Sequence, residues 1–290
     1  MQELTEIVKE TLQDHSITVY NWKDSDGWID ELIKKFSPLI REYYTNLEGL
    51  KKELPKLLGE ETEFSQKEID DFLSACLKAS IPDPSKDPKG KPLHLQSYRS
   101  DFAEILAMLC LEELFDTTIP VRGIRSKEIH DLPSRGIDVI GYETPDDKIH
   151  LILCEVKGST SIKNPPECVS GKKDSIENQL LSCVCDQEKT LQRLLAIYAK
   201  CEKPQKEMMF KILFYWQKQN HSKMKIILCP FLVREKSKYH EKDYKFIIDK
   251  LPEYNPAIIR FIIICINENL SELSKKLYEF APYLEVHHDD

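Results

Sequence analysis

The central stretch of the chain reads IDVIGY at residues 137–142 and, after a polar break, LILCEVK at residues 151–157. Side chains alternate along a strand with a period of two, so Glu155 and Lys157 point to the same face. If the two runs pair as neighbouring strands, Asp138 meets Glu155 across the ladder. The stretch therefore predicts two adjacent strands that gather two acids and a lysine at one place.

Two carboxylates and an ammonium in one small site are unfavourable unless a divalent cation joins them. Asp138 and Glu155 would hold the ion, with the backbone carbonyl of Val156 as a third protein ligand. The acids cluster without an imidazole, and the thiol of Cys154 points to the opposite face, so the pattern predicts Mg²⁺, or Mn²⁺ in its place. This pattern is typical of a metal-dependent phosphodiesterase. The alternative is two core strands with exposed charges at their ends.

A third acid lies in the segment SDFAEILAMLCLEELF, residues 100–115, which predicts a helix over 101–115 with Ser100 as its N-cap. Glu104 lies beside the apolar stripe of this helix and not opposite it. Its carboxylate is a candidate for the outer shell of the metal. The other interpretation is a glutamate at the boundary of the core that reaches out to water.

The order of these features resembles the PD-(D/E)xK nuclease superfamily: a helix with Glu104, a strand with Asp138 and a strand with Glu-x-Lys. Within it, the strings RSDFAEILAMLCLEELF, RGIDVIGY and LILCEVKGSTS are similar to HamA, the nuclease family of the Hachiman anti-phage defence system, over roughly residues 95–270. The resemblance implies a Mg²⁺-dependent deoxyribonuclease that acts on DNA with a HamB-like DNA helicase in the bacterial cytoplasm.

Two positions depart from the family patterns. Ile137 stands where the superfamily motif has proline, which changes the name of the motif but not its chemistry. RecB-like relatives carry a Gln-x-x-x-Tyr motif on the next helix, whereas Gln179 here is followed at the fourth position by Cys183. That accessory contact to DNA is therefore absent in its usual form.

The expected reaction assigns further roles around the metal. Lys157 would orient or help to deprotonate a water and contact the phosphate. Candidate contacts to the DNA backbone follow downstream, namely Ser159, Lys163, Lys172 and Lys173. Contacts of this kind read phosphates, so they imply no sequence specificity.

The charge distribution bears on how DNA reaches the site. The chain has 290 residues, 41% of them hydrophobic, and a formal net charge of −8. Residues 201–250 have a positive local charge although the whole chain is acidic, with 12 basic residues against 6 acidic ones. This basic stretch begins with Lys203, Lys206, Lys211, Lys218, Lys223 and Lys225. It is either a phosphate-contacting face or a solvated surface. The acidic remainder predicts weak unaided DNA binding, so a partner would have to deliver the DNA.

No apolar run is long enough to span a bilayer, and the N-terminal sequence MQELTEIVKE lacks the pattern of a secretory signal. The nine cysteines are scattered and mostly flanked by apolar residues, which is typical of reduced thiols. Cys183-x-Cys185 has no companion pair, so buried thiols are favoured there over a zinc site. We expect a cytoplasmic protein without a membrane partner.

Local patterns predict the organisation of the chain. Besides the elements above, we expect helices over 2–14, 28–44, 174–199 and 268–280, and strands over 17–22, 119–124, 223–233 and 257–266. The segment IPDPSKDPKGKP, residues 81–92, predicts a linker. It would separate a mostly helical accessory region, residues 1–90, from a nuclease-like domain, residues 91–290. The fold class expected is α/β, a restriction-endonuclease-like core with a mixed central sheet flanked by helices.

Two rival functions remain at this level. One is a catalytically silent module that only regulates a helicase, against which the intact set of Asp138, Glu155 and Lys157 argues. The other is a stand-alone restriction-type endonuclease, which would need its own DNA-reading domain. The acidic N-terminal region, residues 1–80, does not resemble such a domain and is instead the candidate contact surface for the helicase. No Gly-x-x-x-x-Gly-Lys-Ser/Thr motif occurs, so nucleotide hydrolysis is not expected of this chain.

Overall fold

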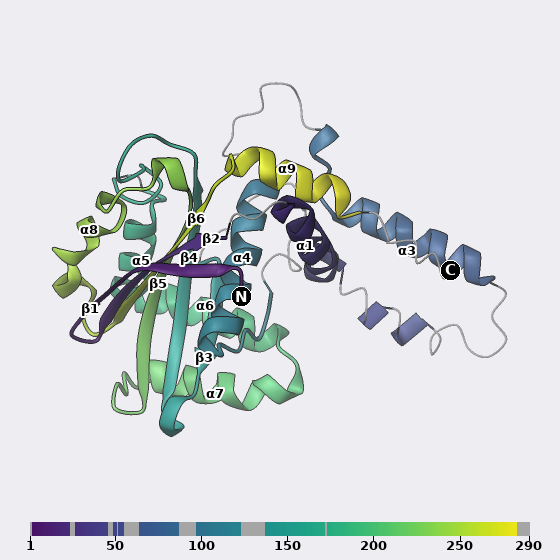
Figure 1. Cartoon of the computed structure of the whole chain (residues 1–290). Coiled ribbons are helices and arrows are strands. Elements are labelled where there is room, and N and C mark those ends of the chain that lie inside the picture. The colour runs from purple at the N-terminus through teal and green to yellow at the C-terminus, as the bar shows by residue number, and fades with distance from the viewer. Residues whose placement is uncertain are drawn as a thin grey trace. The chain divides into compact units, whose positions relative to one another are not determined.

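The sheet that carries the predicted acids has six strands in the order β1-β2-β6-β5-β4-β3. The computed structural model describes residues 2–23, 27–45, 49–50, 52–54, 64–86, 97–122, 137–171 and 173–282. The strands are β1 (Leu4–Leu12), β2 (His15–Trp22), β3 (Val139–Glu143), β4 (Ile149–Ser159), β5 (Met224–Glu235) and β6 (Ile258–Ile266). Strands β2, β6, β5 and β4 run parallel, and β1 and β3 flank them as antiparallel edges (Figure 1).

The described α-helices are α1 (Trp28–Thr45), α3 (Gln66–Ser80), α4 (Ser97–Phe115), α5 (Ile176–Cys185), α6 (Gln187–Lys200), α7 (Lys203–Gln217), α8 (Lys242–Ile248) and α9 (Leu270–Phe280). The expected α/β class, with a mixed sheet flanked by helices, is confirmed. None of these helices is both long enough and apolar enough to cross a membrane.

The chain divides into two compact units, each built from several segments. The first unit comprises the described residues within 1–23, 106–122 and 135–270, and the second those within 24–105 and 271–290. Each unit draws residues from both sides of position 90. The division into residues 1–90 and 91–290 therefore stays a prediction about which part can fold alone.

The first unit is organised around the sheet. Helices α5 and α7 pack on one face of it, and α6 packs against both helices. Leu153 of β4 lies in one buried core with Leu180 of α5 and Ile212 of α7. On the other face, the guanidinium of Arg260 lies 4.5 Å from the ring centroid of Phe115, in the C-terminal half of α4. Because both faces are covered, β4 is buried over most of its length.

The second unit is helical and has its own polar core. The Tyr44 hydroxyl of α1 donates to the Asp101 carboxylate of α4 and lies 3.4 Å from the Tyr278 hydroxyl of α9. Phe36 and Phe102 pack with ring centroids 5.5 Å apart. Of the expected linker, residues 81–86 are described and end in the short turn η1 (Pro84–Lys86), while residues 87–92 lie outside the described residues.

The expected helix over residues 2–14 is wrong, because Leu4–Leu12 forms strand β1. The segment contains Thr5, Ile7 and Val8, whose branched side chains favour strand over helix. Strand β1 pairs antiparallel with β2, and this pairing brings the N-terminal residues into the central sheet.

The strand expected over residues 119–124 does not form within the described residues 119–122. Only an isolated bridge from Thr118 to Tyr142 occurs here. Pro120 lacks the N–H that a central strand would have to donate. The segment is therefore irregular up to Arg122, where the described part ends.

The single helix expected over residues 174–199 is two helices. Asp186 ends α5, and its side chain then accepts the N–H of Lys189 at 3.0 Å to begin α6. Helix α7 also lies in a stretch for which the sequence predicted only a basic surface. Both differences concern the helical layer beside the predicted metal site.

Candidate metal centre

Asp138 and Glu155 come together at the end of the β3–β4 ladder. The last registered pair, Val139 and Cys154, places Asp138 opposite Glu155 one step beyond it. The Oδ2 of Asp138 accepts the N–H of Val156 at 2.7 Å and so ties the start of β3 to β4. The structure thus brings together the two acids that the strand pattern placed side by side.

Glu155 is buried, with only 2% of its surface exposed. Burial and then the charge of Asp138 raise the pKa of Glu155 to about 8, against the opposing effect of Lys157. Its Oε1 accepts from the Nζ of Lys157 at 2.7 Å, while its buried Oε2 has no hydrogen-bond partner within the described part of the chain. A buried carboxyl with one unsatisfied oxygen is suited to a further cationic partner.

Lys157 supplies a positive charge beside the acids. Burial lowers the pKa of Lys157, but the charges of Glu155 and Asp138 outweigh burial and raise it above its ordinary value. The side chain is 26% exposed. Lys157 therefore stays protonated and can donate to an anion that reaches this edge of the sheet.

Val156 contributes its backbone. In an extended strand, the N–H and C=O of one residue point to the same side. Because the Val156 N–H reaches Asp138 on the β3 side, its carbonyl oxygen faces that side as well, beyond the last pair of the ladder. This placement is compatible with a third oxygen ligand.

The donor chemistry fits a hard divalent cation. Among the described residues, no three side chains of His, Cys, Asp or Glu gather closely enough to hold a metal ion. The protein would thus offer the carboxylates of Asp138 and Glu155 and one carbonyl, and Mg²⁺ is commonly held by one or two carboxylates plus waters. The unsatisfied Glu155 oxygen and the raised pKa of its carboxyl reflect burial first and the neighbouring acid Asp138 second, an arrangement that a divalent cation stabilises.

Arg193 is a cation near this site that the sequence did not single out. It lies on α6, and its Nη1 is 3.8 Å from the Sγ of the buried Cys183. Its charge is among the effects that oppose the rise in the Glu155 pKa. The sequence did not predict that Arg193 lies near the acids. Its position depends on the direction of α6, which is set by the unexpected end of α5 at Asp186.

Glu104 lies in α4 within the second unit and is buried, with 4% of its surface exposed. Burial raises the pKa of Tyr278 well above its ordinary value, and the charges of Asp101 and Glu104 add to this rise. The role of Glu104 in the outer metal shell stays a prediction.

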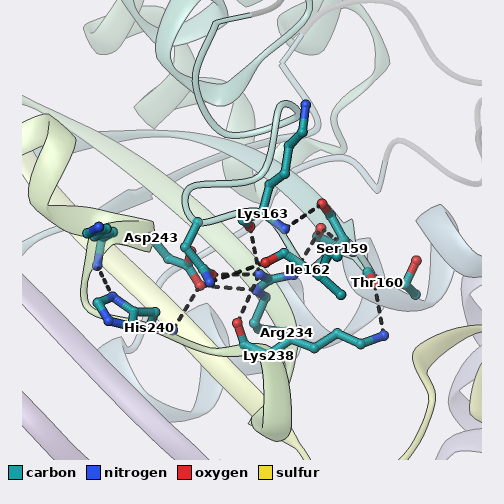
Figure 2. A network of polar contacts seen from close by, with 11 residues as sticks. Ser159, Thr160, Ile162, Lys163, Arg234, Lys238, His240 and Asp243 are labelled. Carbon is teal, nitrogen blue, oxygen red and sulfur yellow. Dashed lines mark hydrogen bonds and ion pairs between the residues drawn. The ribbon is translucent and has the colours of Figure 1, made fainter.

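A buried guanidinium holds the segment that follows β4. Arg234 of β5 is fully buried, and its Nε lies 3.0 Å from the Oδ2 of Asp243 on α8. Its other nitrogens reach five acceptors: the Ser159 hydroxyl at 3.3 Å, the Ser161 carbonyl at 2.5 Å, the Lys163 carbonyl at 3.0 Å, the Asn164 Oδ1 at 2.8 Å and the Lys238 carbonyl at 3.0 Å. Figure 2 labels Ser159, Lys163 and Lys238 around this guanidinium. The network fixes the backbone of residues 159–164 directly downstream of Lys157.

The four expected DNA contacts lie in different surroundings. Ser159 is buried, with 4% of its surface exposed, and its hydroxyl is used inside the protein. Lys163 is exposed and pairs with Glu167, with 2.5 Å between Nζ and Oε1. Lys173 is exposed as well, whereas Lys172 lies outside the described residues. Their contacts to DNA stay predictions, and Ser159 would have to leave its buried partners to make one.

The family model HamA matches residues 2–281, nearly the whole chain. Among curated proteins, none matches the chain. The matched region contains Asp138, Glu155 and Lys157, so the whole candidate metal centre lies inside it.

Proposed function

The chain belongs to the HamA family, and we propose on that premise that it is a metal-dependent deoxyribonuclease, the effector of a Hachiman defence complex. Membership of this family implies a role in Hachiman anti-phage defence. The observation that carries the nuclease activity is the meeting of Asp138, Glu155 and Lys157 at the end of the β3–β4 ladder. Two acids and a lysine at a strand end suit hydrolysis of a phosphodiester.

The residues of this chain divide the work in the proposed site. Asp138, Glu155 and the Val156 carbonyl would hold Mg²⁺, which supplies electrostatic stabilisation of the negative charge that develops on the phosphate. The Val156 N–H keeps the Asp138 carboxylate turned toward β4. Lys157, held by Glu155 but partly exposed, is placed to orient a water or a phosphate oxygen.

We further infer that a DNA helicase acts with this chain. With a net charge of −8, the chain repels a phosphate backbone over much of its surface, which weakens unaided binding. The sequence contains no P-loop motif, so any ATP-driven step would come from a partner. A nonspecific nuclease would also attack the DNA of its host, so the partner is expected to restrain activity and to direct it.

One experiment tests the nuclease and the partner together. The tagged chain is isolated from its native cells, and supercoiled plasmid is incubated with the chain alone and with any helicase that co-purifies. We expect a helicase in the complex, cleavage with Mg²⁺ and none with EDTA. Undiminished cleavage in excess EDTA, or no cleavage by either sample with Mg²⁺ or Mn²⁺, would contradict the proposed activity.

A further inference from the structure

Helix α7 exposes two phenylalanines on one side. Phe210 is 59% exposed and Phe214 is 52% exposed. The opposite side of the helix already supplies the core through Met209, Ile212 and Trp216. The two exposed rings are therefore not needed to pack α7 on the sheet, and residues four apart on a helix lie next to each other. Adjacent exposed aromatic rings point to a ligand.

Lysines stand at both ends of this aromatic pair. Lys206, Phe210, Phe214 and Lys218 are exposed and follow one another at intervals of four residues, so they form one row along α7. The row spans about 18 Å, and its two rings are about 6 Å apart along the axis. At about 3.4 Å per base step, the rings are about two steps apart.

The charge around the row is positive although the chain is acidic. Residues 187–218, which comprise α6 and α7, carry seven basic side chains against three acidic ones. Glu207 of α7 pairs with Lys211, with 2.8 Å between Oε1 and Nζ, so this acid does not offset the lysines of the row. The lysines therefore favour a negatively charged ligand, and the exposed rings favour a ligand that also has flat apolar groups. Exposed aromatic rings interleaved with lysines suit single-stranded nucleic acid, because unpaired bases stack on the rings while the lysines contact phosphates.

We propose that the row Lys206, Phe210, Phe214 and Lys218 is a binding surface for single-stranded DNA, separate from the metal centre. Helix α6 packs against α7, as Figure 1 shows, and carries Arg193 beside Cys183, within electrostatic reach of Glu155. The surface thus lies in the basic helical layer that packs on the sheet carrying the candidate metal centre. Charge favours DNA over a protein partner, since lysine is depleted in protein interfaces. The DNA substrate itself rests on the proposed function, but strand binding can be measured without cleavage.

The test measures binding of a fluorescein-labelled oligothymidylate to the full chain in EDTA by anisotropy. Phe210→Ala/Phe214→Ala should weaken binding by about tenfold or more. The matched control is Phe72→Ala/Phe280→Ala, which removes two phenylalanines with exposures of 53% and 55%, and it should bind like the wild type. Both double variants alter exposed side chains, so both should remain folded, and thermal melts that match the wild type check this.

Two readouts separate stacking from charge. Phe210→Trp/Phe214→Trp should keep the affinity and show tryptophan fluorescence quenching when the strand binds. Lys206→Gln/Lys218→Gln should reduce the salt dependence of binding, with a change in slope of about 0.7 for each lost phosphate contact. The phenylalanine-to-alanine variant should leave this slope unchanged.

The outcomes distinguish this surface from the nuclease assignment. Equal affinities for the Phe210→Ala/Phe214→Ala variant and its control overturn the proposal, as does a wild-type chain that cleaves plasmid but binds no oligothymidylate at low salt. In both cases the nuclease assignment stands. A variant that loses a co-purifying protein but keeps strand binding would make the row a protein interface and also overturns the proposal. Failure of plasmid cleavage in all conditions counts against the proposed function. The affinities for oligothymidylate then still show whether the row on α7 binds single-stranded DNA.

Discussion

The ammonium of Lys157 lies 2.7 Å from the Oε1 of Glu155, two residues earlier on the same face of β4. Asp138 approaches the same place from the start of β3, so two acids share one lysine. Burial of Glu155 then makes one further positive charge favourable. A divalent cation would supply this charge.

Asp138→Asn, Glu155→Gln and Lys157→Met should each reduce plasmid cleavage by about two orders of magnitude or more, because each removes a charge needed in the transition state. The three groups act as one unit, so Asp138→Asn/Glu155→Gln should be little worse than either single change. Glu253→Gln, at an exposed acid, is the control. Initial rates with Mg²⁺ measure the effect, and a Lys157→Met rate equal to that of the control would place the reaction elsewhere.

Mg²⁺ should raise the melting temperature of the chain without DNA, because an ion that binds only the folded state stabilises it. At about 100 times Kd the gain is about 2.7 kcal/mol. Asp138→Asn/Glu155→Gln should abolish the shift by removing both carboxylates. Thermal melts across a Mg²⁺ titration measure it, and a shift of the same size in the double variant would mean that the ion binds at another place.

Arg234→Met should destabilise the chain by about 3–5 kcal/mol, because it leaves Asp243 buried without its guanidinium partner. Arg234→Met/Asp243→Leu should recover part of the loss, since no lone charge stays buried. Lys245→Met breaks an exposed pair with Glu241 and should change the free energy of unfolding far less than Arg234→Met. Urea unfolding compares them, and an Arg234→Met effect as small as that of Lys245→Met would disprove the structural role of the network.

Glu177 should make stability depend on pH in the acid range. Burial raises the pKa of Glu177, but hydrogen bonds from Lys250 and Ser170 outweigh burial and bring it below its ordinary value. The resulting stabilisation is full above the unfolded pKa of about 4.3 and is lost as pH falls through the lower folded pKa. Glu177→Gln should therefore destabilise the chain at neutral pH, and its difference from the wild type should shrink as pH falls through the folded pKa of Glu177. A variant-to-wild-type difference that is independent of pH would contradict this.

Deletion of residues 1–80 should prevent folding of the sheet, because it removes β1 and β2 and leaves the edge of β6 uncovered. An exposed apolar edge strand pairs with other chains, so size-exclusion chromatography should show aggregates. A monomeric truncated chain that unfolds cooperatively would contradict this. The helicase contact of this region is better tested by Asp71→Lys on α3, since Asp71 is exposed and the sheet stays intact.

The sequence was most informative where structure follows from local spacing. The strands at 17–22, 223–233 and 257–266 and the helices at 28–44 and 101–115 are confirmed to within a few residues. Ser100 is not the N-cap of α4, because the helix includes Ser97–Phe115 and Ser100 lies inside it. Ser65 and Glu68, which have the Ser-x-x-Glu spacing in the sequence, form the capping box that begins α3. The predictions were wrong where the sequence has only a weak preference for helix or strand, as in the N-terminal strand. They were also wrong where one polar side chain ends a helix within a continuous apolar pattern, as at Asp186.

The sequence by itself determined that Glu155 and Lys157 share a face of β4, because the two-residue period of a strand requires it. It also indicated that Asp138 would lie opposite Glu155, since the polar break between the two runs is short. Only the tertiary structure decided that Arg234 would hold Ser159 and the segment after it, and that Arg193 of α6 would stand near the acids. Arg234 and Ser159 are 75 residues apart in the chain. Their contact depends on the parallel pairing of β4 and β5, which no local pattern encodes.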